Sequence, residues 1–163
     1  MKNNTTKSLV VYYSIEGNTD FVAQIIGNQL KADILRLEPE KSITTIKPLK
    51  YFWGGKQVLT RTRPKLKKFT IDPQKYTNIV IGTPVWVGTF SPVLNSFFQN
   101  VPLNGKKIAI FCTHEGRPVR ALQNMTRVLQ SQNEIVSQTN FLRPLLNKEQ
   151  VEKQAISWVK NLF

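Results

Sequence analysis

The chain is poor in cysteine and histidine. Its 163 residues include one of each, so no disulfide can form within the chain, and no histidine-cysteine grouping has the spacing of a metal site. The first eight residues are polar and lead into only five apolar ones, too few for a membrane span or a signal peptide. We therefore expect a cytoplasmic protein that is large enough to bury a core of its own.

Acidic residues are also scarce, and the excess positive charge is concentrated in one segment. The chain has 23 Lys and Arg against 10 Asp and Glu, a formal net charge of +13. Ten of these cations and only two of the acids lie between Pro39 and Lys75. Such a charge influences which partners the protein binds and how fast it associates with them, and it carries no information about the fold. Residues 51–69 could bind nucleic acid or an anionic membrane, but we favour a solvated connection.

The stretch from Val10 to Thr19 is the most informative part of the sequence. The apolar run Leu9–Tyr13 predicts a strand buried on both faces, and apolar residues at helical spacing from Val22 to Leu30 predict a helix. The turn between them consists of Ser14, Ile15, Glu16, Gly17, Asn18 and Thr19. A strand that turns into a helix in this way directs backbone N–H groups and a helix dipole at one point, which suits phosphate. The alternative is an ordinary turn with Asn18 as N-cap.

Two other phosphate-binding turns are excluded by spacing. A dinucleotide fingerprint needs three glycines, and this turn has only Gly17; a P-loop is absent, because Gly54-Gly55-Lys56 follows no strand. The remaining pattern, S-x-E-G-N-T, resembles the phosphate loop of flavodoxins, [ST]-x-[ST]-G-N-T. The family uses a hydroxyl for the FMN phosphate where this chain has Glu16. We expect that residue to contribute only its backbone N–H.

Strands and helices alternate along the rest of the chain. Further strands are predicted at Asp33–Glu38, Asn78–Thr83, Lys107–Thr113 and Glu134–Phe141. Helices are predicted after the N-cap Ser91, around Leu122–Leu129, and after Asn147, where Gln150 would complete a capping box. The long basic connection is predicted to hold one more helix, at Leu49–Leu59, with the aromatic cluster Tyr51, Phe52 and Trp53.

This alternation predicts an α/β fold with a parallel sheet covered by helices on both faces. The first, third and fourth strands are continuously apolar and hence central, while the second and fifth carry polar residues and suit the edges. The strand order that satisfies both conditions is 2-1-3-4-5, the order for which flavodoxin is the known example. We expect one flavodoxin-like three-layer sandwich over residues 1–163, with the basic connection 39–75 between the second and third strands.

Two further strand ends would meet the first turn at one crevice. The segment Thr83, Pro84, Val85 and Trp86 resembles the first flavin loop of flavodoxins, in which an aromatic ring lies against the isoalloxazine. A strand-end aromatic packed on the next helix is the alternative for Trp86. Gly88 could permit the peptide reorientation seen in such loops, or it could be a simple turn glycine.

The second flavin loop is matched by Thr113, His114, Glu115 and Gly116. In the family its backbone N–H groups bind the pyrimidine edge, and a tyrosine commonly covers the second face of the ring. Here His114 offers the only ring, and we favour a plain loop residue over a proton source. Cys112 and Arg117 have C-x4-R spacing after the fourth strand rather than C-x5-R after the first. This excludes a phosphatase of the same topology and favours a buried core cysteine.

The resemblance implies an FMN-binding redox protein that acts in electron transfer. The flavin would carry the chemistry, so we assign no catalytic residue. The alternative is an FMN-dependent NAD(P)H reductase of quinones or similar acceptors, with Arg117 and Arg120 serving a nucleotide phosphate. Given the charge, we expect an acidic redox partner protein, or else a small-molecule acceptor.

Overall fold

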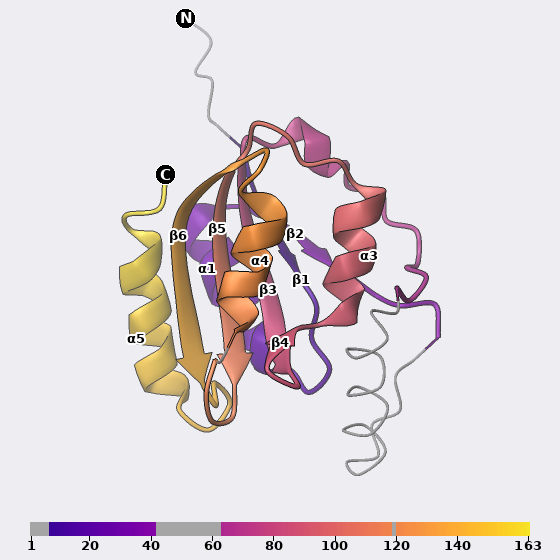
Figure 1. The fold of residues 1–163 in the computed structure, drawn as a ribbon. Coiled ribbons are helices and arrows are strands. Elements are labelled where there is room, and N and C mark those ends of the chain that lie inside the picture. Colours follow the sequence, from indigo (N-terminus) through magenta and orange to yellow (C-terminus); the bar gives the residue numbers. More distant parts are fainter. Residues whose placement is uncertain (1–6, 42–62, 119) are drawn as a thin grey trace, which may run out of the picture.

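A mainly parallel sheet forms the centre of the computed structural model, which describes residues 7–41, 63–118 and 120–163 (Figure 1). Its strands are β1 (Ser8–Tyr12), β2 (Asp33–Arg36), β3 (Asn78–Trp86), β4 (Thr89–Phe90), β5 (Lys107–His114) and β6 (Glu134–Leu142). The parallel strands follow the order β2-β1-β3-β5-β6, and β4 pairs antiparallel with β3. The predicted order is therefore confirmed, with β4 as an addition. The predicted helix at 49–59 lies outside the described residues.

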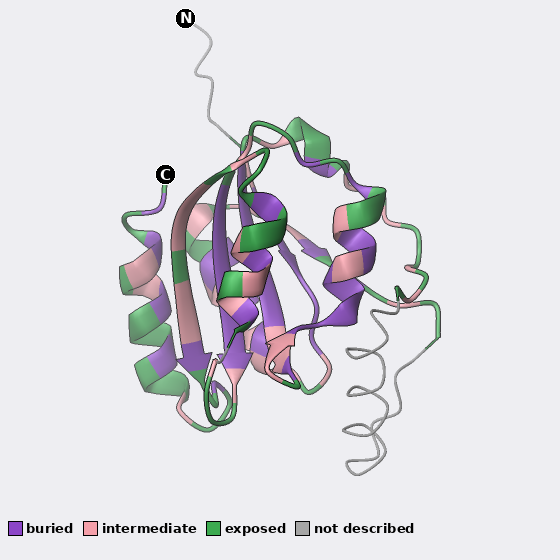
Figure 2. Ribbon diagram, in the orientation of Figure 1, coloured by how far each residue is buried: buried purple, intermediate pink, exposed green. Residues whose placement is uncertain are grey.

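The central strands are those whose residues are buried on both faces. Every residue of β1 from Leu9 onward is buried, as are Asn78–Thr83 of β3 and Ile108–Thr113 of β5. Figure 2 shows these strands in the buried colour, whereas most of β6 is intermediate or exposed. A strand between two neighbours and two helical layers meets no water, which explains why apolar runs predicted its place in the sheet.

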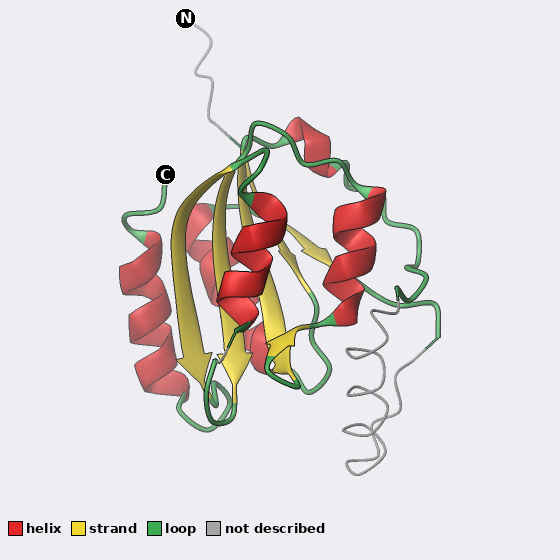
Figure 3. Cartoon of the chain, viewed as in Figure 1, coloured by secondary structure: helices red, strands yellow, loops and turns green. Residues whose placement is uncertain are grey.

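Helices cover both faces of the sheet (Figure 3). They are α1 (Asn18–Leu30), α3 (Pro92–Asn100), α4 (Ala121–Leu129) and α5 (Lys148–Val159), with a 3₁₀ turn, η1, at Pro73–Lys75. On one face α1 and α5 pack in a cluster with Phe111 and Phe141; on the other, α3 and α4 pack in a cluster with Ile81 and Ile110. None of the helices within the described ranges is long and apolar enough to cross a membrane.

The helix starts agree only in part with the predicted caps. Ser91 caps α3 as predicted, because its hydroxyl accepts the N–H of Val93 at 3.3 Å. At α1 the N-cap is Gly17, with φ of 89°, so the Asn18 alternative is wrong. Asn147 does stand at the N-cap of α5, but no side-chain cap bond forms there. Its amide instead donates to the carbonyl of Leu142 at 3.1 Å, so the predicted capping box is wrong.

Strand β3 is longer than predicted. It continues past Thr83 to Trp86 and returns as β4, with Val85 opposite Phe90. Pairing with β1 stops at Gly82, so Pro84 lies where β3 has lost one neighbour and proline is tolerated in a strand. The predicted loop is therefore a β-hairpin, which holds its side chains more rigidly than a free loop would.

The described part of the basic connection is packed and ion-paired. Leu66 and Phe69 contact the core cluster beneath α3, so residues 63–75 are not simply a solvated segment. Lys65 pairs with Glu40 at 3.0 Å, and Lys67 pairs with Glu38 at 2.7 Å. The Lys67 ammonium lowers the pKa of the Glu38 carboxyl. Nearby carboxylates thus partly neutralise the positive charge of two of the ten Lys and Arg residues.

We predict that Gly82→Ala destabilises the protein at the centre of the sheet. Gly82 lies opposite Phe111 in the β3–β5 register, and an added Cβ would lie 2.8 Å from ring atom Cε2 and closer still to two others. Such overpacking should lower the free energy of unfolding by about 3 kcal/mol, measured by urea denaturation.

Gly116→Ala is the matched control, because an added Cβ there meets nothing within 4 Å. We expect a change of no more than about 0.5 kcal/mol for it. Similar losses in both variants would show that close approach to Phe111 is not the constraint at position 82.

Candidate ligand-binding crevice

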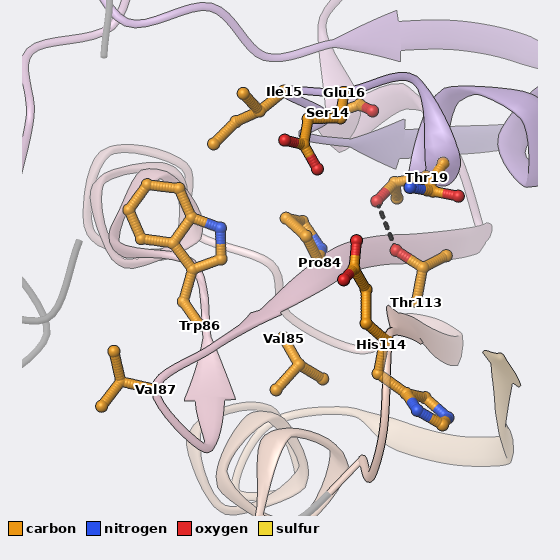
Figure 4. A pocket seen from close by; sticks show the side chains of 12 residues that line it. Ser14, Ile15, Glu16, Thr19, Pro84, Val85, Trp86, Val87, Thr113 and His114 are labelled. Carbon is orange, nitrogen blue, oxygen red and sulfur yellow. Dashed lines mark hydrogen bonds between the residues drawn. The ribbon is translucent and has the colours of Figure 1, made fainter. Parts of the chain in front are cut away.

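The carboxyl ends of β1, β3 and β5 enclose a crevice (Figure 4). About 680 Å³ of space lies between its walls, a figure that includes open solvent at the mouth. The lining residues are Ser14, Ile15, Glu16, Asn18, Thr19, Pro84, Val85, Trp86, Val87, Thr113, His114 and Glu115. They come from the three segments singled out in the sequence, which the parallel sheet brings to one edge.

Four of the predicted site residues do not line the crevice. Gly17 is the N-cap of α1, and Gly116 is exposed beyond the lining. Thr83 is fully buried and its hydroxyl accepts the N–H of Ser91 at 3.0 Å, so it supports the start of α3. Gly88 lies in the β3–β4 turn. Conversely, Val87 lines the crevice but was not among the predicted site residues.

The wall formed by the first turn carries an unused hydrogen-bonding group. Ser14 is 4% exposed, and its Oγ is buried without a hydrogen-bond partner. The first turn of α1 begins close by, and the N–H groups of a helix's first turn have no partner within the helix. A buried hydroxyl beside a helix N-terminus favours an anionic group of a ligand at this end of the crevice.

Two further contacts shape this wall. The hydroxyls of Thr19 and Thr113 lie 2.8 Å apart and join the turn to the end of β5 (Figure 4). From β2, the Arg36 guanidinium donates to the Ser14 carbonyl at 3.4 Å and lies 3.8 Å from Asp20. Arg36 was not among the predicted site residues. The parallel register that places it beside Tyr12 would have identified it, once strand order and alignment were known.

The opposite wall is largely apolar, with Trp86 as its main surface. Trp86 is 8% exposed and packs edge-on against Tyr13, with ring centroids 6.4 Å apart. It therefore belongs to the core and also lines the crevice. In Figure 4 the indole faces the crevice, with Ile15 and Pro84 around the same space.

The tip of the β3–β4 hairpin is strained. Its two turn residues, Val87 and Gly88, both have positive φ, of 44° and 77°. This is typical of the tight hairpin turn that favours Asn-Gly, and the simple-turn alternative for Gly88 is supported. A β-branched residue in this conformation is a genuine outlier. Val87 nevertheless stands there, 60% exposed, at the mouth of the crevice.

The His114 ring does not face the indole. Its Nε2 lies 2.8 Å from Oδ1 of Asn140 on β6, and Figure 4 shows the imidazole turned away from Trp86. Its Nδ1 is buried without a hydrogen-bond partner. Because the ring is held toward β6, His114 cannot cover a ligand on the side opposite Trp86.

Burial disfavours the charged forms of three groups near the crevice. Burial and the hydrogen bond to Asp20 raise the pKa of Tyr12 to about 12, and burial also raises the pKa of Tyr13 above its ordinary value. Burial alone raises the pKa of the Cys112 thiol to about 12, and this cysteine is the buried core residue that was predicted.

Comparison with known proteins identifies relatives of similar fold. A family model described as flavodoxin matches residues 7–162. A protein from Bacteroides uniformis ATCC 8492 that is classed as a flavoprotein has a similar structure, with a TM-score of 0.80 at 20% identity, covering 95% of this chain and 98% of that one. No curated protein matches the chain.

Two further solved structures are similar at lower scores. A flavoprotein in complex with FMN from Lactobacillus acidophilus NCFM has a TM-score of 0.71 at 19% identity, covering 87% of this chain and 97% of that one. The apo form of an NADH:FMN oxidoreductase has a TM-score of 0.60 at 16% identity, covering 96% and 88%. At these identities the solved structures establish the fold, and the family model covers nearly the whole chain.

We predict that Val87→Asn stabilises the protein. Asparagine accepts the left-handed conformation that valine resists, so the free energy of unfolding should rise by about 1 kcal/mol in urea denaturation. Val128→Asn is the control, because Val128 is also exposed but lies within α4. If Val87→Asn is no more stable than this control, the hairpin tip carries no strain.

Proposed function

The chain belongs to the flavodoxin family, and on this basis we propose that it binds FMN in the crevice and transfers electrons. One observation carries the proposal. A single crevice combines a buried, unpartnered hydroxyl beside a helix N-terminus with an apolar wall that presents an indole. FMN has the same two parts, a phosphate and a flat aromatic ring.

The residues present fit these two parts. At the anionic end, the hydroxyl of Ser14 and the first-turn N–H groups of α1 would hold the phosphate. At the apolar end, the indole of Trp86 and the side chains of Pro84 and Val85 would contact the ring. Stacking of a planar base on an aromatic side chain contributes about 1–3 kcal/mol, comparable with several ordinary hydrogen bonds. When bound, the flavin supplies the electron-transfer chemistry.

The first prediction from this proposal concerns the phosphate. Ser14→Ala removes the buried, unpartnered hydroxyl and leaves the backbone N–H groups of the turn in place. We expect it to weaken FMN binding about tenfold, measured by fluorescence titration, and riboflavin binding by no more than about twofold. Riboflavin has the same ring without the phosphate and is the internal control. Equal losses for both ligands would contradict a phosphate site at this turn.

The second prediction concerns the ring. Trp86→Ala should weaken FMN and riboflavin alike, by about tenfold if one stacking contact is lost. Because a stacked indole quenches flavin fluorescence, the variant should also fluoresce more strongly in the bound state. Trp158→Ala is a matched control, since that indole packs with Phe111 and Phe141 on the other face of the sheet. Unchanged fluorescence in Trp86→Ala would place the indole away from the ring.

A reductase is the second candidate function. Arg117 and Arg120 are exposed on the loop after β5, next to the crevice residues, where they could bind the phosphates of NAD(P)H. Anaerobic mixing with NADH or NADPH separates the two candidates. A carrier should stay oxidised over minutes and accept electrons one at a time from a chemical reductant. Rapid bleaching by either nucleotide would favour the reductase.

The charge of the chain supports an acidic redox partner. A net charge of +13 raises the rate at which negatively charged proteins associate with it, and the effect weakens as salt increases. We therefore propose that its redox partner is an acidic protein.

A further inference from the structure

Exposed apolar side chains gather at the end of the molecule where the crevice opens. Within the described ranges six large apolar side chains are exposed, and three of them, Leu142, Leu145 and Leu146, lie in the loop of residues 142–147 between β6 and α5 (Figure 1). A fourth, Val87, lies at the mouth of the crevice. We call residues 142–147 the leucine loop. Such a local concentration of exposed apolar side chains is typical of an interaction surface.

The three leucines take no part in the core. Leu146 is 79% exposed, and neither core cluster of the described residues includes Leu142, Leu145 or Leu146. A leucine side chain stabilises a protein when it leaves water. The fold therefore gains little from these three side chains, and removal from water by a partner would be favourable.

Hydrogen bonds hold the leucine loop against the rest of the fold. The N–H of Arg143 donates to the His114 carbonyl at 2.8 Å, and its Nε donates to the Glu115 carbonyl at 2.9 Å. The N–H of Leu145 donates to the Asn18 side chain at 3.1 Å. Because the loop is ordered before any partner arrives, binding through it loses little conformational entropy.

Cationic side chains flank the leucines. Arg143 lies within the loop and Lys148 directly follows it, and both are exposed. On the neighbouring loop after β5, Arg117 and Arg120 are exposed as well. The chain contains no Asp or Glu from position 135 to position 148. The leucine loop is therefore an apolar surface with a positive margin, on a chain of net charge +13.

The acids at this end do not cancel the positive margin. Glu16 and Glu115 line the crevice, and Glu149 on α5 pairs with Lys153 at 2.6 Å. Arg143 and Lys148 are thus the charges that flank the leucines along the chain.

This combination fits an anionic lipid bilayer better than a protein partner. A standard protein interface takes about 20–30 residues from each side and is enriched in aromatic residues at its centre. Three leucines on one short loop are a small surface by that measure. A bilayer needs no matching pocket, because apolar side chains enter the headgroup region and cations lie beside lipid phosphates.

We propose that the leucine loop docks the protein on an anionic lipid bilayer. Leu142 and Leu146 enter the headgroup region, and Arg143 and Lys148 lie beside the lipid phosphates. The protein lies on the membrane surface and does not span it. None of the three leucines lines the crevice, so docking does not depend on the proposed function. Because Leu142 lies opposite His114 at the crevice edge of the sheet, docking brings the crevice mouth to the bilayer surface.

Cosedimentation with lipid vesicles tests the proposal. The protein should bind vesicles of phosphatidylcholine mixed with phosphatidylglycerol and leave vesicles of phosphatidylcholine alone unbound. Leu146→Ser should lower the partition coefficient about tenfold, as expected when one leucine no longer leaves water. Lys148→Gln should lower it about fivefold at low salt, as expected for one cation near an anionic surface.

The opposite end of α5 supplies two matched controls. Phe163 is an exposed apolar side chain and Lys160 an exposed cation, and both follow the last turn of the helix. Phe163→Ser and Lys160→Gln make the same chemical changes away from the leucine loop. Each should change the partition coefficient by no more than about twofold.

A nitroxide label distinguishes insertion of the loop from adsorption in any orientation. A label on Leu146→Cys should lose its accessibility to a water-soluble relaxation agent when anionic vesicles are added. A label on Phe163→Cys should keep its accessibility. Cys112 is fully buried, so the label should react at the introduced cysteine.

Three results would overturn the inference. Absence of binding to anionic vesicles would exclude a bilayer as the partner. Equal losses in Leu146→Ser and Phe163→Ser, or an unprotected label at position 146, would show that the leucine loop is not the contact. Binding to an acidic redox protein such as a ferredoxin that is lost in Leu146→Ser, without binding to vesicles, would assign the loop to a protein partner. FMN titration of the same protein reports separately on the proposed function.

Discussion

The parallel register of β1, β3 and β5 is the constraint on which the crevice depends. Tyr12 lies opposite Gly82, and Gly82 lies opposite Phe111, so the three strands reach the same edge together. The connection that follows each strand is different: a turn begins at Ser14, a hairpin tip at Val87 and a loop at Glu115. Because parallel strands end at one edge of the sheet, side chains that are far apart in the sequence become neighbours in space.

The site depends on supporting residues as much as on its walls. Thr113 holds the Thr19 hydroxyl, Arg36 contacts the Ser14 carbonyl, and Arg143 occupies the carbonyls of His114 and Glu115. The Arg36 and Arg143 contacts join the ends of neighbouring strands, and the Thr113 contact joins β5 to the start of α1. A ligand site on strand ends gains precision in this way, since a loop held by a second loop has fewer conformations to lose on binding.

The positive charge of the chain is less uniform than its composition indicates. In the described part of the basic connection, Lys65 and Lys67 pair with Glu40 and Glu38, and Leu66 and Phe69 pack against the core. The exposed ion pairs add little stability, because solvent screens their attraction. Their effect is local, because each places a carboxylate within reach of a cation whose field would otherwise extend into solvent.

The sequence alone determined the fold class, the strand order and the three segments that form the crevice. These depend on local patterns: apolar runs mark buried strands, helical spacing marks covering helices, and polar strands mark edges. Boundaries were less predictable. Pro84 indicated the end of β3, yet the strand continues to Trp86 because pairing with β4 and β5 outweighs the lost N–H.

Only the tertiary structure decided which side chains face the crevice and what holds them there. Asn18 reaches Leu145 rather than capping α1, Asn147 bonds Leu142 rather than α5, and His114 bonds Asn140 rather than facing Trp86. The physical reason is the same in each case. A polar side chain pairs with whichever donor or acceptor the fold brings nearest, whether that group lies five residues away, as for Asn147, or on a neighbouring strand, as for His114.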